Sequence, residues 1–440
     1  MHDNQGNAPV GTISMTTAIL MTMNIMIGTA VYGLPHQMAA IAGNASFLSW
    51  TIAGLMLLPA VMCISRLSQI VPSSNGFFMY SYQAMGRLPG YIVGMIYMSG
   101  YIFASTAILH MFRQAVLKLV PAFTLANNSF QFFALFMMII FLLNILSVGV
   151  IARIQDKLTI IKFSPILLAF LFFPFAIDSG FHITMPEFLS LPQTLSLGLF
   201  GFFGFEFTCN IGHHLKNKAD GARAIMIGFL SVVACKTLFH FAVLHIMGVE
   251  NLINMSASSF TKFLPFLSSD FKGYVVGVAS YLIFISFFSS ANGITLLVSS
   301  MLSSMSNNGL VRGASVLSQT NAYSRPWVIL LIQCTFITAM GTCFTNVKQL
   351  ADMTVTALFL TYWITVLALC IIEYQRKSSA WNLNFARVSF VITFGVLVFF
   401  LNAAVPAPLT TLSILAGCVM FGLLFYKPEE PAEIHTTLNS

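Results

Sequence analysis

Long apolar stretches follow one another along almost the whole chain, separated by short polar segments. Many reach about twenty residues, the length at which an α-helix crosses the ~30 Å hydrocarbon layer of a bilayer. None shows the alternation over about ten residues that is typical of a membrane β-strand. We therefore predict an all-α, polytopic membrane protein with about twelve transmembrane helices, at roughly 13–41, 45–65, 88–111, 131–150, 157–177, 192–212, 222–248, 273–303, 326–345, 350–373, 386–403 and 408–426.

The charged residues indicate the orientation of these spans. With 57% hydrophobic and 8% charged residues, a soluble fold of 440 residues would have too few polar groups for its surface. If the N-terminus is cytoplasmic, thirteen lysines and arginines fall on inner segments, namely Arg66, Arg87, Arg153, Lys157, Lys216, Lys218, Arg223, Arg312, Arg325, Arg376, Lys377, Arg387 and Lys427. Five fall on outer segments: Arg113, Lys118, Lys262, Lys272 and Lys348. This asymmetry follows the positive-inside rule and predicts an integral protein of the plasma (bacterial inner) membrane with both termini cytoplasmic. The net charge of +7 is thus a topology signal, and nucleic-acid binding is excluded.

The predicted organisation is one transmembrane unit without a soluble domain. We expect a cytoplasmic tail at 1–12, a transmembrane transporter domain at 13–426 and a cytoplasmic tail at 427–440. The N-terminus lacks the basic region of a cleaved signal peptide, so the first span is expected to remain. The seven cysteines are scattered, with no CxxC pair and no Cys/His cluster. Neither a metal site nor a cofactor is therefore expected.

Two spans are interrupted by small residues. One interruption is at Gly28–Ala30, and the other, at Gly201–Gly204, directly precedes Glu206. A carboxylate inside hydrocarbon usually lines a cavity enclosed by protein. Paired interruptions in corresponding spans indicate the central binding site of a secondary transporter. They also suggest a first repeat at about 13–177, a second at about 192–373 and extra helices at about 386–426.

Several motifs resemble, in the right order, those of the amino acid–polyamine–organocation (APC) superfamily. Ile27–Tyr32, with Pro35 after it, is similar to the first-helix signature Ile-Gly-(Ser/Thr/Ala)-Gly-(Ile/Val)-(Phe/Tyr). The other matches are the loop Pro72–Gly76, the sixth-helix pattern Phe200–Glu206 with His214–Asn217 after it, and the loop residues Asn308–Leu310 and Arg325-Pro326. The resemblance implies a fold like that of LeuT, with two inverted repeats of five helices and broken first and sixth helices. A weaker similarity points to the neutral amino acid exporters of methionine and branched-chain type.

The resemblance also implies a substrate site. It assigns the substrate backbone to Ile27, Gly28, Thr29, Ala30, Phe200, Gly201 and Phe202, with Phe200 as an aromatic gate. Free N–H groups at a half-helix start suit a carboxylate, and free carbonyls at a half-helix end suit an ammonium group. Phe202, Ser105 and Ile294 are expected at the side-chain end of the pocket. The alternative is that the glycines only allow close helix packing.

Three charged residues within spans are predicted to couple transport to protons or conformation. Lys162 ends the motif Gln155–Lys162, which resembles that of sodium-independent members whose lysine ammonium replaces sodium; alternatively, it reaches the inner interface. Glu206 is expected to support the broken helix, with no second acidic residue in a span near the breaks. Lys236 lies mid-span and either faces the pathway, pairs with a carboxylate such as Glu206, or is a hydrogen-bonded structural residue.

We predict an amino acid permease that moves neutral, mainly apolar L-amino acids by alternating access, without sodium and by proton coupling or exchange. The expected partners are the amino acid, protons and the lipid bilayer, with a homodimer left open. The chief alternative is an antiporter of basic amino acids or polyamines. A channel would leave the paired breaks unexplained, and an enzyme is not expected because H-E-x-x-H, G-x-S-x-G and paired intramembrane aspartates do not occur.

Overall fold

The structure is a computed structural model and describes residues 14–71, 76–120, 122–175, 181–210, 215–217, 220–254 and 269–428. The predicted tail 1–12 and all but two residues of the tail 427–440 lie outside this part. The α-helices are α1 (Met15–Met26), α2 (Thr29–Gly33), α3 (Pro35–Ala42), α4 (Leu48–Ile70), α5 (Phe78–Met85), α6 (Arg87–Leu119), α7 (Ser129–Asn144), α8 (Val148–Phe172), α9 (Met185–Leu189), α10 (Leu195–Phe200), α11 (Phe207–Asn210), α12 (Asp220–Met247), α13 (Val249–Ile253), α15 (Ser269–Asn307), α16 (Ala314–Leu317), α17 (Trp327–Cys343), α18 (Val347–Gln375), α19 (Ala380–Ala403) and α20 (Pro408–Leu423). Short 3₁₀ helices are η1 (Gly43–Phe47), η2 (Thr124–Asn127), η3 (Phe173–Phe175) and η4 (Leu191–Thr194).

The described residues form helices and no strand, which confirms the predicted all-α class. In the part of the chain that the structure describes, seven helical stretches are long and apolar enough to cross a membrane, and four shorter apolar helices accompany them. The interrupted segment α10–α11 adds one more, so seven, four and one make the predicted twelve. The first predicted span, 13–41, is divided into α1, α2 and α3, because Pro35 starts a new helix after the break.

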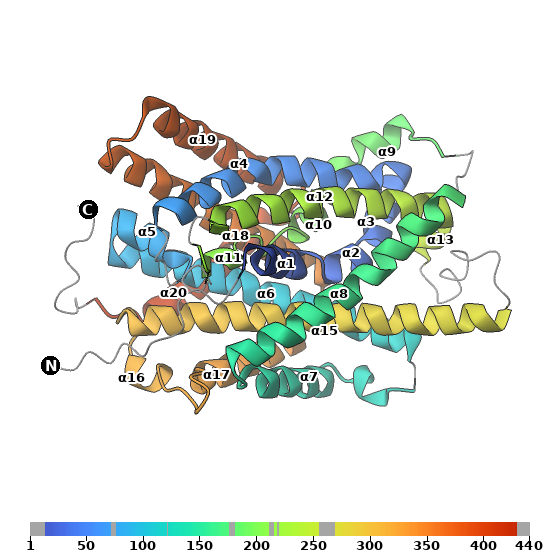
Figure 1. The fold of residues 1–440 in the computed structure, drawn as a ribbon, viewed down its shortest axis with the longest axis horizontal. Helices are drawn as coiled ribbons and strands as arrows, with labels where there is room; N and C mark the ends of the chain where they lie inside the picture. The colour runs from blue at the N-terminus through green and yellow to red at the C-terminus, as the bar shows by residue number, and fades with distance from the viewer. Residues whose placement is uncertain are drawn as a thin grey trace.

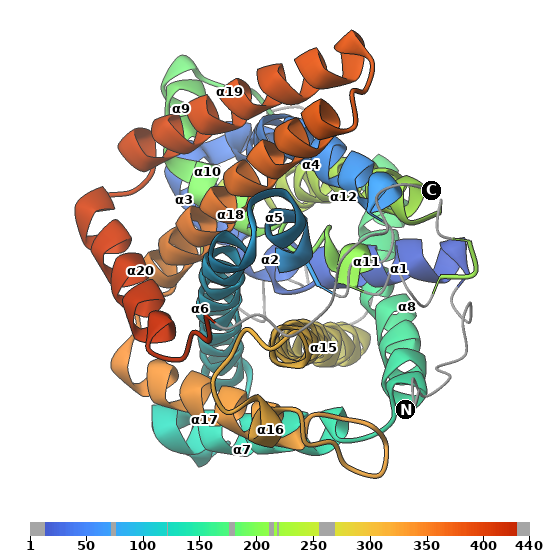
Figure 2. The ribbon, with the colours of Figure 1, turned by 90° about the vertical axis from the view of Figure 1, so that its left-hand side faces the viewer.

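The long helices run side by side along the bundle (Figure 1). In the end view, α2, α6 and α15 lie closer to the middle, whereas α7, α17, α19 and α20 lie at the periphery (Figure 2). The central helix α6 contacts both α15 and α18. Peripheral α19 and α20 expose apolar side chains such as Trp381 and Leu409, each 79% exposed, as expected of helices that face lipid.

The connecting segments gather at two opposite ends of the bundle. Helices α5 and α16 lie at one end and α9 and α13 at the other (Figure 1). At the first end, Nη2 of Arg87 donates to the carbonyl oxygens of Gly309 (2.9 Å) and Lys427 (3.2 Å). At the same end, Nε of Arg66 on α4 donates to Glu373 of α18 at 2.9 Å. Segments predicted to be cytoplasmic thus share one end, while the orientation in the membrane stays a prediction.

Candidate substrate site between the two breaks

The first break separates α1 from α2 at Ile27 and Gly28. Gly28 packs so closely on α15 that a Cβ atom there would lie 1.8 Å from Oγ of Ser290, so only glycine fits without a shift. Within the described residues, the amide N–H groups of Gly28 and Ala30 donate no backbone hydrogen bond. These are the unpaired donors expected at a helix start, and they give the break a partial positive charge.

The second break separates α10 from α11 and consists of the turn 201–206. Gly204 has a φ of +103°, in the region that favours glycine. A Cβ atom at Gly204 would lie 2.3 Å from Cγ2 of Ile25, a residue of the last turn of α1. The second break therefore packs against the end of α1 that directly precedes the first break, and the predicted break positions are confirmed.

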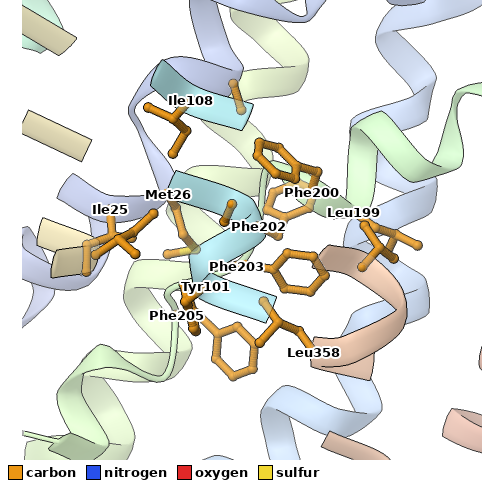
Figure 3. Close-up of a cluster of buried hydrophobic side chains, with 14 of the residues drawn as sticks. Ile25, Met26, Tyr101, Ile108, Leu199, Phe200, Phe202, Phe203, Phe205 and Leu358 are labelled. Carbon is orange, nitrogen blue, oxygen red and sulfur yellow. The ribbon is translucent and has the colours of Figure 1, made fainter. Parts of the chain in front are cut away.

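A cavity of about 30 Å³ lies between the breaks. It is lined by Ile25, Met26, Ala30, Tyr101, Ala104, Ile108, Phe200, Gly201, Phe203, Ser290 and Ile294. Figure 3 shows several of these side chains, from α1, α6 and the second break, gathered around the broken segment. This volume has room for about two water molecules. An amino acid side chain would need more, so its entry requires these walls to move apart.

The structure brings only part of the predicted substrate residues to this cavity. Ala30, Phe200, Gly201 and Ile294 line it. Ile27 is buried outside the lining, and Gly28 lies behind it against the lining residue Ser290. Ser105 is buried beside the lining residue Ala104, and its hydroxyl has no hydrogen-bond partner among the described residues.

Phe202 points away from the predicted pocket end. Its ring packs edge-on against Trp50, with 5.9 Å between centroids, and against Phe229 at 5.5 Å. Phe202 is therefore part of the packing behind the break, unlike its neighbour Phe200 on the cavity side. The backbone of Thr29 belongs to α2, and its side chain lies outside the described part. The sequence alone therefore did not distinguish residues that line the cavity, such as Phe200, from residues that pack behind it, such as Phe202.

Glu206 is fully buried in the second break and is held by hydrogen bonds. The hydroxyl of Tyr101 donates to Oε1, and the amide N–H of Gly204 donates to Oε2 at 3.3 Å. Tyr101 in turn packs against Tyr97, with ring centroids 4.8 Å apart. The Glu206 carboxylate therefore links the turn of the second break to α6. Its partner Tyr101 also lines the cavity.

Lys162 of α8 is fully buried and lies beside the end of α1. Its Nζ donates to Oδ1 of Asn24 at 2.7 Å and to the carbonyl oxygen of Asn24 at 3.1 Å. Asn24 lies in the last turn of α1, directly before the first break. The hydroxyl of Tyr32, beyond the break, donates to the carbonyl oxygen of Lys162. Lys162 thus connects α8 to the residues on both sides of the first break. Its side chain is buried in the protein and does not extend to the membrane–water interface.

Lys236 of α12 does not pair with Glu206. Its Nζ donates to the carbonyl oxygen of Gly201, the first residue of the second break. The same atom lies 4.7 Å from the ring centroid of Trp50 and 4.9 Å from that of Phe202. The sequence left three interpretations of Lys236 open. The hydrogen bond to Gly201 agrees with the third, a hydrogen-bonded lysine.

A further buried carboxylate, Asp352 of α18, was missed by the sequence reasoning. It lies in the predicted span 350–373, and α18 packs against α10, which starts the second break. The expectation that Glu206 is the only acidic residue in a span near the breaks is therefore wrong. Asp352 does not line the cavity. Its charge within an apolar span was the signal that could have revealed it.

A membrane-embedded helical bundle with two broken helices in contact around a central cavity is the architecture of a secondary transporter. The chain belongs to the amino acid permease family, whose model matches residues 13–427. This finding confirms the predicted superfamily and LeuT-like fold class. It also identifies an integral membrane protein in a family of transporters.

Individual relatives are distant. The serine/threonine exchanger SteT of Bacillus subtilis (strain 168) is 20% identical over 83% of this chain and 84% of its own. The methylthioribose transporter of the same organism is 23% identical over 89% of this chain and 87% of its own. An arginine/agmatine antiporter of Chlamydia pneumoniae is 26% identical over 52% of this chain and 51% of its own. These relatives support amino acid transport and leave the substrate class open.

Proposed function

We propose that this protein is a secondary transporter that moves neutral, mainly apolar L-amino acids across the plasma membrane by alternating access, without sodium. The observation that carries the proposal is the cavity between the two breaks, whose side-chain wall is largely aliphatic and aromatic. Burial of apolar substrate surface against such a wall contributes roughly 25 cal/mol per Å².

The breaks supply partners for the groups that all amino acids share. The N–H groups of Gly28 and Ala30 suit the α-carboxylate, because they donate no backbone hydrogen bond within the described residues and lie at the positive end of α2. Carbonyl groups of the broken segments suit the α-ammonium group. The carbonyl of Gly201 already accepts from Lys236, so the ammonium group is expected to use other carbonyls of the breaks.

The charges around the cavity favour a neutral side chain. Among the described residues, no carboxylate lines the cavity, and Glu206 is already bonded by Tyr101 and Gly204. A substrate cation buried there would lack a partner, which is strongly unfavourable. The antiporters of arginine among the relatives support the alternative, a basic substrate.

We propose that the Lys162 ammonium group takes the place that the superfamily resemblance assigns to sodium. Its two hydrogen bonds to Asn24 fix a positive charge at the end of α1. A sodium ion bound nearby would be repelled by this charge in a medium of low dielectric constant. Lys162 and Glu206 remain candidates for proton coupling, and Phe200 for the gate.

A competition experiment tests the substrate class. The purified protein is reconstituted in liposomes, and counterflow of labelled L-leucine is measured against a panel of unlabelled competitors. L-Leucine and L-methionine are expected to inhibit at concentrations at least about tenfold lower than L-arginine or putrescine, since one tenfold step corresponds to only ~1.4 kcal/mol of binding free energy. Stronger inhibition by arginine or putrescine would establish the basic alternative instead.

A further inference from the structure

Lys236 holds a positive charge against the back of the cavity wall. The residue is 1% exposed, and its Nζ donates to the carbonyl oxygen of Gly201. Gly201 itself lines the cavity. The peptide group that accepts from the ammonium group therefore belongs to the residue that a substrate would touch. The hydrogen bond alone does not require a lysine at this position, because any small donor could satisfy one carbonyl.

The surroundings of Lys236 fit an ammonium group closely. The indole N–H of Trp50 donates to Nδ1 of His240 at 3.1 Å, which leaves the hydrogen of the neutral imidazole on Nε2, 3.2 Å from Oγ of Ser46. Trp50 is thereby oriented with its ring facing Nζ. Nζ also lies 4.9 Å from the ring centroid of Phe202, so two aromatic faces stand within the distance at which a ring attracts a cation.

The absence of a side chain at Gly201 leaves room for Lys236 and Trp50. A Cβ atom there would lie 2.4 Å from the Trp50 ring and 2.8 Å from Nζ of Lys236, so a larger residue would displace both. Glycine therefore lets the lysine and the tryptophan approach the break directly. The positive charge consequently lies within about one peptide group of the cavity.

Two buried lysines, Lys162 and Lys236, hydrogen-bond directly to the two broken segments, and Glu206 is bonded within the second break. Asp352, a further buried carboxylate on α18, does not line the cavity. A neutral amino acid enters as a zwitterion without adding net charge. An amino acid with a cationic side chain adds a further positive charge beside two fixed ones, in surroundings that screen charges weakly.

We propose that Lys236 is a positioning and specificity-determining residue: its ammonium group orients the carbonyl of Gly201 and rejects amino acids with cationic side chains. The inference rests on the proposed function and names the residue behind its preference for neutral substrates. If Lys236 only stabilised the fold, its replacement would have a different effect on transport. Its loss would weaken leucine and arginine transport together and leave their ratio unchanged.

Three substitutions separate these roles. Lys236→Met removes the charge at similar length, Lys236→Gln removes the charge and keeps an N–H donor, and Lys236→Arg keeps the charge. The readout is the ratio of the arginine to the leucine concentration that halves leucine counterflow in proteoliposomes. Leu238→Ala, at an exposed position of the same helix, is the control and should behave as the wild type.

The ratio is expected to fall at least about tenfold in Lys236→Met and Lys236→Gln and to stay near the wild-type value in Lys236→Arg. If the methionine variant does not fold, the glutamine variant decides. If neither transports, the same ratio is read from competition for labelled leucine binding to purified protein. An unchanged ratio in a charge-free variant, or an equal fall in Lys236→Arg, would overturn the inference. A wild type that already prefers arginine would instead refute the proposed substrate class.

Discussion

Replacement of Lys162 by alanine is expected to reduce leucine counterflow to the background of protein-free liposomes. The substitution removes the buried ammonium group that bonds both oxygens of Asn24, at 2.7 and 3.1 Å, directly before the first break. Each buried acceptor left without a donor costs about 1–3 kcal/mol. The positive charge proposed to replace sodium is lost at the same time. The break should then no longer hold the conformation that binds substrate.

Lys157→Ala serves as the matched control, because Lys157 is an exposed residue of the same helix. Both variants are compared with the wild type at equal amounts of monodisperse protein, which separates lost transport from lost folding. Normal counterflow by Lys162→Ala would contradict the proposed role of the lysine, although the fold would still stand.

Gly28→Ala is expected to lower counterflow about ten- to hundredfold. The new methyl group would lie 1.8 Å from Oγ and 2.9 Å from Cβ of Ser290 on α15, so the first break must shift. Overpacking of this kind costs about 1–3 kcal/mol, and each ~1.4 kcal/mol corresponds to a factor of ten in rate.

A second substitution shows whether this clash is the cause. Ser290→Gly removes both opposing atoms, so the double variant Gly28→Ala/Ser290→Gly should recover much of the lost rate. Gly395→Ala in α19, where nothing lies within 4 Å of the new Cβ atom, should transport normally. Full activity of Gly28→Ala, or no recovery in the double variant, would show that close packing at the break is not needed.

The breaks and the fold class could be predicted because each has a strong local signal. Gly28 and Gly204 interrupt apolar spans at positions where the structure requires glycine, one by close packing and one by its positive φ. Glu206 was identifiable because a carboxylate is rare in hydrocarbon. Span number followed from length and apolarity alone. These features depend on single residues or on composition and need no knowledge of neighbours.

The partners of these residues could not be predicted. Membrane helices are apolar on all sides, so helical periodicity does not reveal which face of α6 lines the cavity. Tyr101, Asn24 and the Trp50–Lys236 contact depend on the packing of helices that are distant in sequence. Phe202 and Phe200 are alike in type and differ only in the direction that the broken backbone gives them.

The most direct test of the account is counterflow of labelled L-leucine into liposomes loaded with unlabelled L-leucine, with choline or sodium as the external cation. The account predicts saturable uptake that is equal in choline and sodium. It also predicts inhibition by L-leucine and much weaker inhibition by D-leucine, because both breaks are proposed to bind the substrate backbone. Uptake that requires sodium, or that rises linearly with leucine without stereoselectivity, would contradict it.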